Sequence, residues 1–230
     1  MAGRQHGFRT SRTARGIALV LALGVLSIAA PVRAMDGKLG VHIVRMDPNG
    51  TDATRYAEPG WGFGVQLTAT ARSRTAKLID SGLLAGIAGI EYVNLQAQEA
   101  LVYDPGGGTV SVERNDQYLG RFYLGPEIGA HGHGLVRPHA GANLALVLYG
   151  ISYGNGLGDH KATYGYDVSA GLDFNPWNTV SFDLGARYVK MFGIPAQLAY
   201  GTAEPIEPAY VQAYLAAAFS LPWLNRGLGH

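Results

Sequence analysis

The stretch TVSFDLGARYVKMF, residues 179–192, decides the class of fold. Apolar residues alternate along it with small, polar or charged residues. The apolar set is Val180, Phe182, Leu184, Ala186 and Tyr188, and the set between them is Ser181, Asp183, Gly185 and Arg187. Successive side chains of a β-strand point to opposite faces, so a period of two predicts a strand with one apolar and one polar face.

The same period recurs along the chain and predicts an all-β protein of eight antiparallel strands. The expected strands cover residues 38–46, 61–71, 82–96, 117–130, 135–149, 162–174, 179–192 and 209–221. The third of them alternates poorly, because Leu, Ile, Ala and Gly occur at both sets of positions. Abundant glycine (33 residues) and frequent tyrosine (13 residues) fit the same class.

The links between the expected strands alternate in length. The longer ones are residues 47–60, 97–116, 154–161 and 193–208, and the shorter ones are 72–81, 131–134 and 175–178. Outer-membrane barrels have short periplasmic turns and longer outer loops. We therefore predict a closed antiparallel up-and-down transmembrane β-barrel. The PGGG run at 105–108 lacks the Lys and Ser/Thr of a phosphate-binding loop, so we expect a flexible loop tip there.

The first 34 residues have the features of a cleavable signal peptide. Residues 1–16 hold four arginines and no acid, an apolar run follows at 17–30, and Ala34 ends a small-residue cleavage site. The apolar run is shorter than the roughly 20 residues that a membrane-spanning helix needs. We expect residues 1–34 to be removed and residues 35–230 to form a single outer-membrane barrel domain.

Removal of the signal peptide changes the charge of the protein. The whole chain has 18 basic and 17 acidic residues, and the first 34 residues carry five arginines and no acid. Residues 35–230 therefore have 13 basic and 17 acidic residues, a net charge of −4. They contain no basic stripe, so we expect no nucleic-acid partner. The chain has no cysteine, which excludes disulfides and a lipid anchor on cysteine.

The charges on the polar faces are sparse and of both signs. They are Arg121, Glu127, Arg137, Asp167, Asp173, Asp183 and Arg187. A soluble barrel turns its apolar face inward, and a membrane barrel turns it outward. Small residues with a few opposite charges suit a narrow interior in which ions pair, so we predict a polar network of these seven residues inside the barrel. Aromatic girdles are expected from Trp61, Phe63, Tyr149, Tyr164, Phe174, Trp177, Tyr188, Phe192 and Phe219.

This pattern resembles the small eight-stranded outer-membrane barrels of Gram-negative bacteria, the group like the OmpA transmembrane domain, OmpX and OmpW. The residues that carry it are the signal peptide, NTVSFDLGARYVKMF at 178–192 and YVQAYLAAAF at 210–219. The resemblance implies a place in the outer membrane among lipid and lipopolysaccharide, and insertion by the barrel-assembly machinery. Such proteins commonly end on an aromatic residue, whereas this chain continues past Phe219. Phe219 is then an internal assembly signal, or the last strand is shifted.

No motif indicates catalysis, a metal or a cofactor. His131, His133 and His139 lie close in sequence, but the glycines between them favour a solvated turn over a metal site. Asp159 and His160 have Ser152 and Ser169 nearby in sequence. The segment from His160 reads His-Lys-Ala-Thr, which does not match the His-x-Ser-Asn pattern of the lipid A deacylases.

We therefore expect a non-enzymatic outer-membrane barrel with a structural or interaction role, or a narrow porin-like passage for small solutes. For eight strands, a closed interior locked by salt bridges is favoured over an open pore. One alternative is a lipid-A-modifying enzyme, an acyl hydrolase or transferase. Another is a soluble periplasmic lipocalin-like barrel that binds a small apolar ligand inside.

Overall fold

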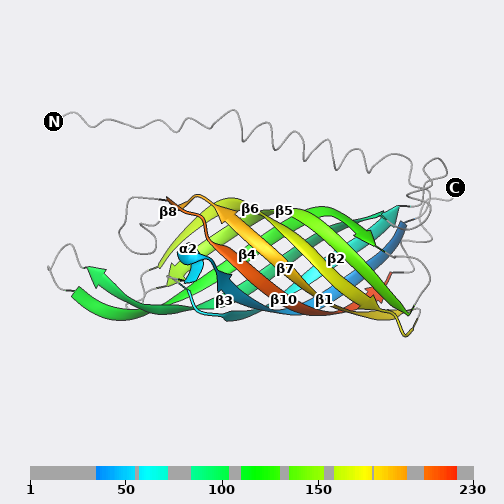
Figure 1. Cartoon of the computed structure of the whole chain (residues 1–230), viewed down its shortest axis with the longest axis horizontal. Coiled ribbons are helices and arrows are strands. Elements are labelled where there is room, and N and C mark those ends of the chain that lie inside the picture. The colour runs from blue at the N-terminus through cyan, green and yellow to red at the C-terminus, as the bar shows by residue number, and fades with distance from the viewer. Residues whose placement is uncertain are drawn as a thin grey trace, which may run out of the picture.

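The structure, a computed structural model, describes residues 35–54, 57–71, 84–103, 110–129, 135–152, 158–177, 179–195 and 205–221. Eight strands close into one barrel in the order β1-β10-β7-β6-β5-β4-β3-β2, and every neighbouring pair is antiparallel (Figure 1). Each strand pairs with the strands next to it in sequence, and β1 pairs with β10, so the sheet has no edge. The closed eight-stranded up-and-down barrel predicted from the sequence is confirmed.

The barrel strands are β1 (Met35–Asn49), β2 (Gly60–Ala71), β3 (Leu84–Tyr103), β4 (Val110–Gly129), β5 (Val136–Ser152), β6 (Gly158–Phe174), β7 (Val180–Phe192) and β10 (Ala209–Ser220). A one-turn helix, α2 (Thr51–Thr54), follows β1, and a short hairpin joins β8 (Ile194–Pro195) to β9 (Pro205–Ile206). Within the described residues, no helix has the length and hydropathy to cross a membrane.

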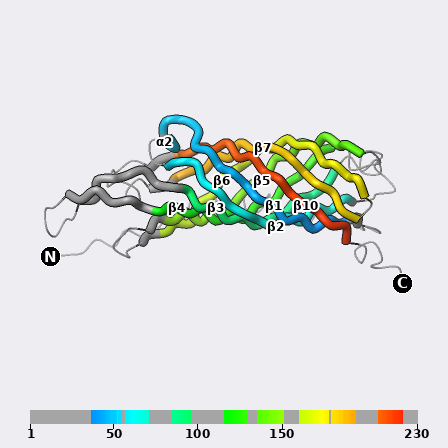
Figure 2. Tube along the Cα trace, turned by 90° about the horizontal axis from the view of Figure 1, so that it is seen from below, coloured from blue at the N-terminus to red at the C-terminus, as the bar shows by residue number. Residues whose placement is uncertain are grey.

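The two ends of the barrel differ. We call the end where β1 begins and β10 ends the turn end, and the opposite end, which carries α2 and the β8–β9 hairpin, the loop end (Figure 1). Figure 2 shows β1 and β10 side by side. Their pairing runs from Lys38 opposite Ser220 at the turn end to Asn49 opposite Ala209 at the loop end.

The prediction of a long loop at 97–116 is wrong. β3 and β4 continue beyond the other strands at the loop end as a two-stranded ribbon, which pairs down to Tyr103 opposite Val110 (Figure 1). Residues 101–103 and 110–112 are rich in Val, Leu and Tyr, which favour strands, and two adjacent strands can pair without a third. The link that remains is 104–109, outside the described residues, as are the PGGG run, His131, His133, residues 1–34 and residues 222–230.

Two other links also differ from expectation. β5 and β6 extend to Ser152 and Gly158, so the expected loop at 154–161 shrinks to a link at 153–157. At the turn end, the link between β2 and β3 spans 72–83 and is longer than three of the four links between barrel strands at the loop end. The alternation of loop lengths is therefore less regular than the sequence suggested, although the barrel that it predicted is present.

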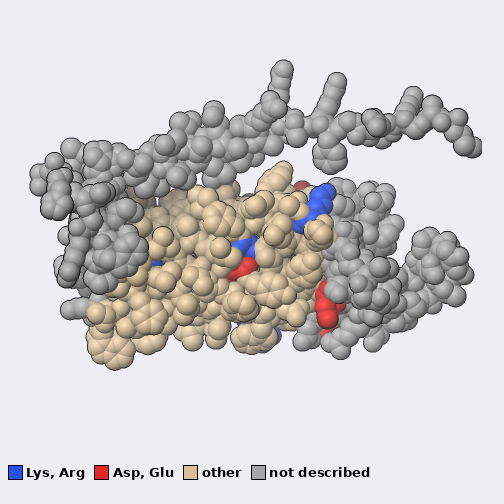
Figure 3. Space-filling model, turned by 180° about the vertical axis from the view of Figure 1, so that it is seen from behind, with Lys and Arg blue, Asp and Glu red and all other residues tan. Residues whose placement is uncertain are grey.

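The outer face of the wall is apolar. Figure 3 shows one side of it, where uncharged residues cover nearly all of the described surface. The outward aliphatic and aromatic side chains from every strand are mostly 40–65% exposed. Examples are Leu39, Val41, Phe63, Val65, Ile90, Phe122, Leu146, Val168, Leu172, Leu184, Val211 and Leu215. An apolar surface that encircles the molecule needs an apolar neighbour.

The lumen near the loop end is filled by apolar side chains, which we call the apolar layer. Its members are buried almost completely: Met46, Val93, Leu95, Leu119, Val147, Tyr149, Val189, Met191 and Tyr210. Ala53 and Ala57, in and just after α2, are also buried against this cluster. The barrel is therefore packed shut below its loop end.

Tyr149 is not part of an outward aromatic girdle, contrary to expectation. It is 2% exposed inside the lumen, and its hydroxyl donates a hydrogen bond of 2.7 Å to Oε1 of Gln117. The odd-numbered residues of β5 point inward from Arg137 onward, and Tyr149 keeps that parity. The period of the strand decides that the side chain of Tyr149 points inward, although this residue lies near the strand end.

Candidate functional site

A polar network fills the lumen between the apolar layer and the turn end. The seven charged residues predicted from the sequence all lie in it, and none of them is on the outer face. They form two groups. Arg121, Asp167 and Arg187 belong to a middle layer, and the other four (Glu127, Arg137, Asp173 and Asp183) surround a cavity at the turn end.

Glu91 is the hub of the middle layer. Its side chain is fully buried, and its carboxylate meets residues from four other strands. Oε1 accepts a hydrogen bond of 2.6 Å from Nε2 of Gln212 and lies 3.5 Å from Nε of Arg121. Oε2 accepts one of 3.3 Å from Nη1 of Arg187 and lies 3.2 Å from Nε2 of His42. One carboxylate thus joins β3 to β1, β4, β7 and β10.

Sequence reasoning missed Glu91 because it lies in the strand that alternates poorly. It is the one charged residue in 84–95, a segment otherwise made of small, apolar, tyrosine and asparagine residues. A single acid in such a strand was the available signal, since an ion of this kind has to find a partner inside the fold.

The guanidinium of Arg187 lies between two tyrosine rings. Its Cζ is 4.8 Å from the ring centre of Tyr123 and 4.6 Å from that of Tyr214. Nη2 of Arg187 and the hydroxyl of Tyr123 both donate to Oε1 of Gln66, at 2.9 and 3.0 Å. Contacts of a cation with aromatic faces are favourable, the more so where water is excluded. They hold Arg187 in the centre of the lumen.

The tyrosine rings need glycine on the wall that they face. Gly89 pairs directly with Tyr123, and a Cβ at position 89 would collide with the tyrosine ring. A Cβ at Gly185 would likewise collide with the ring of Tyr214. In so narrow a barrel, space for a large inward side chain comes from the absence of one on the opposite or adjacent strand.

Asp167 completes the middle layer from β6. Its Oδ1 accepts a hydrogen bond of 2.8 Å from Nδ2 of Asn143, and its Oδ2 lies 3.4 Å from Nη2 of Arg121. The side chains of Asp167 and Arg121 are both fully buried. Two acids, Glu91 and Asp167, therefore face two arginines, Arg121 and Arg187, and their formal charges balance.

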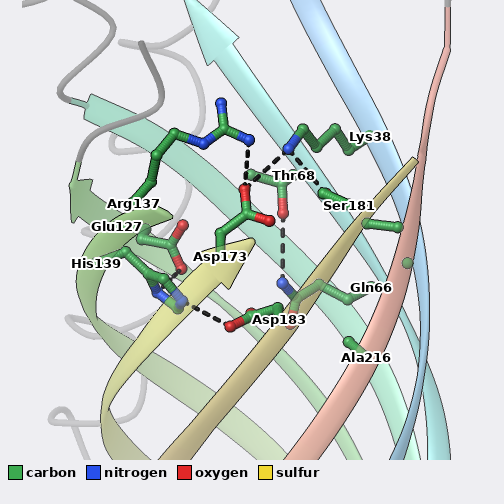
Figure 4. A pocket seen from close by; sticks show the side chains of 12 residues that line it. Lys38, Gln66, Thr68, Glu127, Arg137, His139, Asp173, Ser181, Asp183 and Ala216 are labelled. Atoms are coloured by element: carbon green, nitrogen blue, oxygen red, sulfur yellow. Dashed lines mark hydrogen bonds and ion pairs between the residues drawn. The ribbon is translucent and has the colours of Figure 1, made fainter. Parts of the chain in front are cut away.

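The turn-end group is built around Asp173 (Figure 4). Its Oδ2 accepts hydrogen bonds from Nη2 of Arg137 at 2.7 Å and from Nζ of Lys38 at 3.0 Å. Lys38 also donates to Oγ of Ser181 at 3.0 Å. Lys38 is on β1, whereas Asp173 and Ser181 are on β6 and β7. This lysine, which sequence reasoning also missed, thus reaches past β10 to tie β1 to the wall beyond it.

The interpretation of His139 as a solvated turn residue is wrong. Its imidazole is buried in the lumen between two acids, with Nδ1 3.1 Å from Oε2 of Glu127 and Nε2 2.8 Å from Oδ1 of Asp183 (Figure 4). His139 lies within β5 (Val136–Ser152), as it did within the strand expected at 135–149, and not in the glycine-rich segment at 131–134. Inward parity within the strand was the signal for the correct placement.

This geometry is that of a structural ion cluster. A general base in a nucleophilic triad turns one imidazole nitrogen to an acid and the other to the nucleophile. Both nitrogens of His139 face carboxylates, so neither is turned toward a hydroxyl. His160 and Ser169 also do not meet, because they lie nine residues apart on β6, about 30 Å along a strand. No group of three or more His, Asp or Glu side chains in the described part is arranged to hold a metal ion.

A small cavity of about 40 Å³ lies at the turn end, among the side chains of this group. Charged and hydroxyl groups line it together with Gln66 and the small residues Ala216 and Ala218 (Figure 4). Because Gln66 also accepts hydrogen bonds from Arg187 and Tyr123, it connects the cavity with the middle layer.

No protein-family model matches the chain, and no curated protein matches it. Solved structures do match. Neisserial surface protein A matches at 15% identity and a TM-score of 0.46, over 78% of this chain and 95% of that one. The attachment invasion locus protein Ail of Yersinia pestis matches at 13% identity and a TM-score of 0.47, over 81% and 97%.

A major outer membrane protein of Thermus thermophilus matches at 12% identity and a TM-score of 0.47, over 80% of this chain and 99% of that one. At such identities and TM-scores these likenesses concern the type of fold alone. By its own topology, the chain has the closed eight-stranded antiparallel fold of the small outer-membrane barrels that its sequence resembles.

Proposed function

We propose that the protein is a non-catalytic outer-membrane barrel with a structural or interaction role, and that its lumen passes no solute. The observation that carries this proposal is the inverted barrel, apolar outside and charged inside. Lipid accepts an apolar wall, and a closed sheet leaves no backbone group of the wall unpaired in hydrocarbon. Water would not tolerate so much exposed apolar surface on a monomer.

The position of the outward charges supports the proposal that a band of the wall lies in the hydrocarbon of the membrane. On the described wall, outward charges occur only toward the loop end, where Arg45 and Lys190 are the first of them. The guanidinium of Arg45 lies 5.7 Å from the ring centre of Trp61, which is 61% exposed. Aromatic and basic side chains together are typical of the boundary between hydrocarbon and headgroups. Outer-membrane lipid and lipopolysaccharide are therefore the proposed neighbours of the wall.

The alternative of a soluble lipocalin-like barrel agrees less well with the apolar outer face of the wall. Such a barrel keeps an apolar cavity inside and a charged surface outside. Here the outward side chains are apolar, and the apolar part of the lumen is packed with side chains such as Val147 and Met191, both 0% exposed. The packing leaves no room there for an apolar ligand.

The filled lumen also argues against a solute passage. An eight-stranded barrel is just wide enough for its own side chains. Two successive levels are closed in this one, the middle layer around Glu91 and the apolar layer above it. The parts that remain for partners are at the loop end, where the β3–β4 ribbon extends beyond the other strands (Figure 1).

Export and assembly complete the proposal. β1 begins at Met35, directly after the expected cleavage site at Ala34, so cleavage there would leave the whole strand in the mature protein. β10 ends at Ser220, and Phe219 is exposed on the outer face at the turn end, which favours Phe219 as an internal signal for the barrel-assembly machinery over a shifted last strand.

Three measurements on the expressed protein test this proposal. It should sediment with outer membranes and migrate differently on a gel before and after boiling, because a folded barrel resists detergent. It should give no conductance steps in planar bilayers, and lipid A from expressing cells should keep its acyl chains. Recovery in the soluble periplasmic fraction, regular conductance steps, or a lost or added acyl chain would each contradict the corresponding part of the proposal.

A further inference from the structure

We infer that the lumen is a blind half-channel that binds a cluster of water molecules, open to solvent only at the turn end. The water extends from the turn-end cavity to the middle layer around Glu91 and stops at the apolar layer. This inference rests on the proposed closed barrel but adds a site and a direction of access to it.

The first observation is a set of buried polar atoms without a hydrogen-bond partner in the protein. In the middle layer they are Nε, Nη1 and Nη2 of Arg121, Nε of Arg187, Oδ2 of Asp167, Oδ1 of Asn143 and Oε1 of Gln212. At the turn end, Oδ1 of Asp173 belongs to the same set. The ion-pair contacts of Arg121, at 3.4 and 3.5 Å, lack hydrogen-bond geometry.

Such a set points to water as the ligand. Buried donors and acceptors in folded proteins nearly always have a partner, and ordered water supplies it where side chains do not. Donors and acceptors are both present here, on Arg121 and Arg187 and on Asp167, Asn143 and Gln212. Because the charges of the layer balance, neither a cation nor an anion is favoured over a neutral molecule that both donates and accepts.

The second observation is a space that water can occupy. The turn-end cavity of about 40 Å³ exceeds the roughly 10–15 Å³ that one buried water needs. Lys38, Asp173 and Asp183 contribute to its polar lining, and each keeps some solvent exposure. Gln66 lies between this cavity and Arg187 of the middle layer, so polar groups continue from one to the other.

The third observation is the contrast with the loop end. None of the unpartnered buried atoms found in the described residues comes from the apolar layer. The hydroxyl of Tyr149, which belongs to the apolar layer, donates a hydrogen bond to Gln117 beside it. Apolar side chains packed without voids give water no partner, so the apolar layer ends the water cluster.

The chain has no cysteine, so single-cysteine variants test this inference on a clean background. Asn143→Cys and Val147→Cys form a matched pair. Both positions point into the lumen from β5 and are at most 3% exposed, and Val147 is four residues nearer the loop end. Ala218→Cys samples the cavity, and Ala213→Cys samples the outer wall.

Each folded variant, reconstituted in phosphatidylcholine vesicles, is exposed to silver ions. Thiols that remain unblocked are then counted with a fluorescent maleimide after unfolding, and a gel before and after boiling shows that the variant was folded. We expect Ala218→Cys and Asn143→Cys to be blocked on the order of tenfold faster than Val147→Cys, which should react only during transient opening. Ala213→Cys should also react slowly, because lipid covers it.

Equal rates for Asn143→Cys and Val147→Cys would overturn the inference, because water would then pass the apolar layer. Slow reaction of both Asn143→Cys and Ala218→Cys in folded protein would also overturn it, because the lumen would then be dry. If Asn143→Cys fails to fold, Ser169→Cys on β6 probes the lumen at a neighbouring inward position. Failure of the proposed function looks different, since it appears as conductance or as soluble protein and not as a pattern of thiol reactivity.

Discussion

Replacing Glu91 by alanine should be the most damaging single change in the lumen. The substitution removes the carboxylate that Arg121, Arg187, His42 and Gln212 share at 2.6–3.5 Å. Both arginines stay buried, and only Asp167 remains beside Arg121. Removing one partner of a buried ion pair costs about 3–5 kcal/mol, because the other charge is left without compensation. We expect Glu91→Ala to lower the free energy of unfolding by an amount in this range.

The assay is urea unfolding in phospholipid vesicles, followed by tryptophan fluorescence and by the fraction that migrates as folded protein without boiling. Glu207→Ala is the matched control. Its carboxylate is 54% exposed and lies 3.6 Å from Nζ of Lys190, so its removal should change stability by less than about 1 kcal/mol. A second variant, Glu91→Met with Arg121→Met, should recover part of the loss, because it removes opposite charges together.

A free energy of unfolding of Glu91→Ala within about 1 kcal/mol of the wild-type value, as expected for Glu207→Ala, would contradict this prediction. That result would mean that water solvates the arginines well enough to replace the carboxylate. The barrel topology would still hold, but Glu91 would then not be essential for the stability of the middle layer.

Three more changes test other features of the wall and the lumen. Arg187→Ala should lower the free energy of unfolding by about 3–5 kcal/mol in the same urea assay, and a neutral result would mean that Arg187 faces bulk water. Leu184→Lys places a charge on the outer face at a position that is 61% exposed, and it should destabilise the vesicle-inserted protein by about 2–4 kcal/mol if that face meets hydrocarbon. Unchanged stability of this variant would argue against contact of this face with hydrocarbon. Gly89→Ala should cost about 1–3 kcal/mol because its Cβ collides with a tyrosine ring, whereas Gly86→Ala meets open space and serves as its control. Equal unfolding midpoints for the two glycine variants would refute the tight fit in the lumen.

The wall of the barrel could be predicted from the sequence because each strand carries its own period of two. In β7, for example, the alternation alone places Leu184 outside and Arg187 inside, and the structure agrees. No contact with another strand is needed for that assignment, since parity along one strand is a local property. Where the period was weak, as in β3, the assignment of faces was weak too.

The partners inside the lumen could not be predicted in the same way. Whether Lys38 meets Asp173 or another acid depends on the register in which eight strands close, which is a property of the whole barrel. Lys38 was overlooked for this reason, whereas Glu91 was overlooked because its strand alternates poorly. His139 was overlooked for another reason, because it was grouped with His131 and His133 of the turn although it falls within the expected strand at 135–149.

The pairing of β1 with β10 makes formation of the barrel dependent on the very last strand. Every other strand neighbour is also a neighbour in sequence among the barrel strands, so a growing sheet can add them one after another. The final seam joins segments from opposite ends of the domain, and such long-range closure has the largest entropic barrier and comes late. Glu91 gains His42 from β1 and Gln212 from β10, so two of its four contacts belong to the strands that meet in this step. A chain cut short before residue 209 would keep seven strands and most of its charges, yet it would remain an open sheet with two unsatisfied edges and no way to enter hydrocarbon.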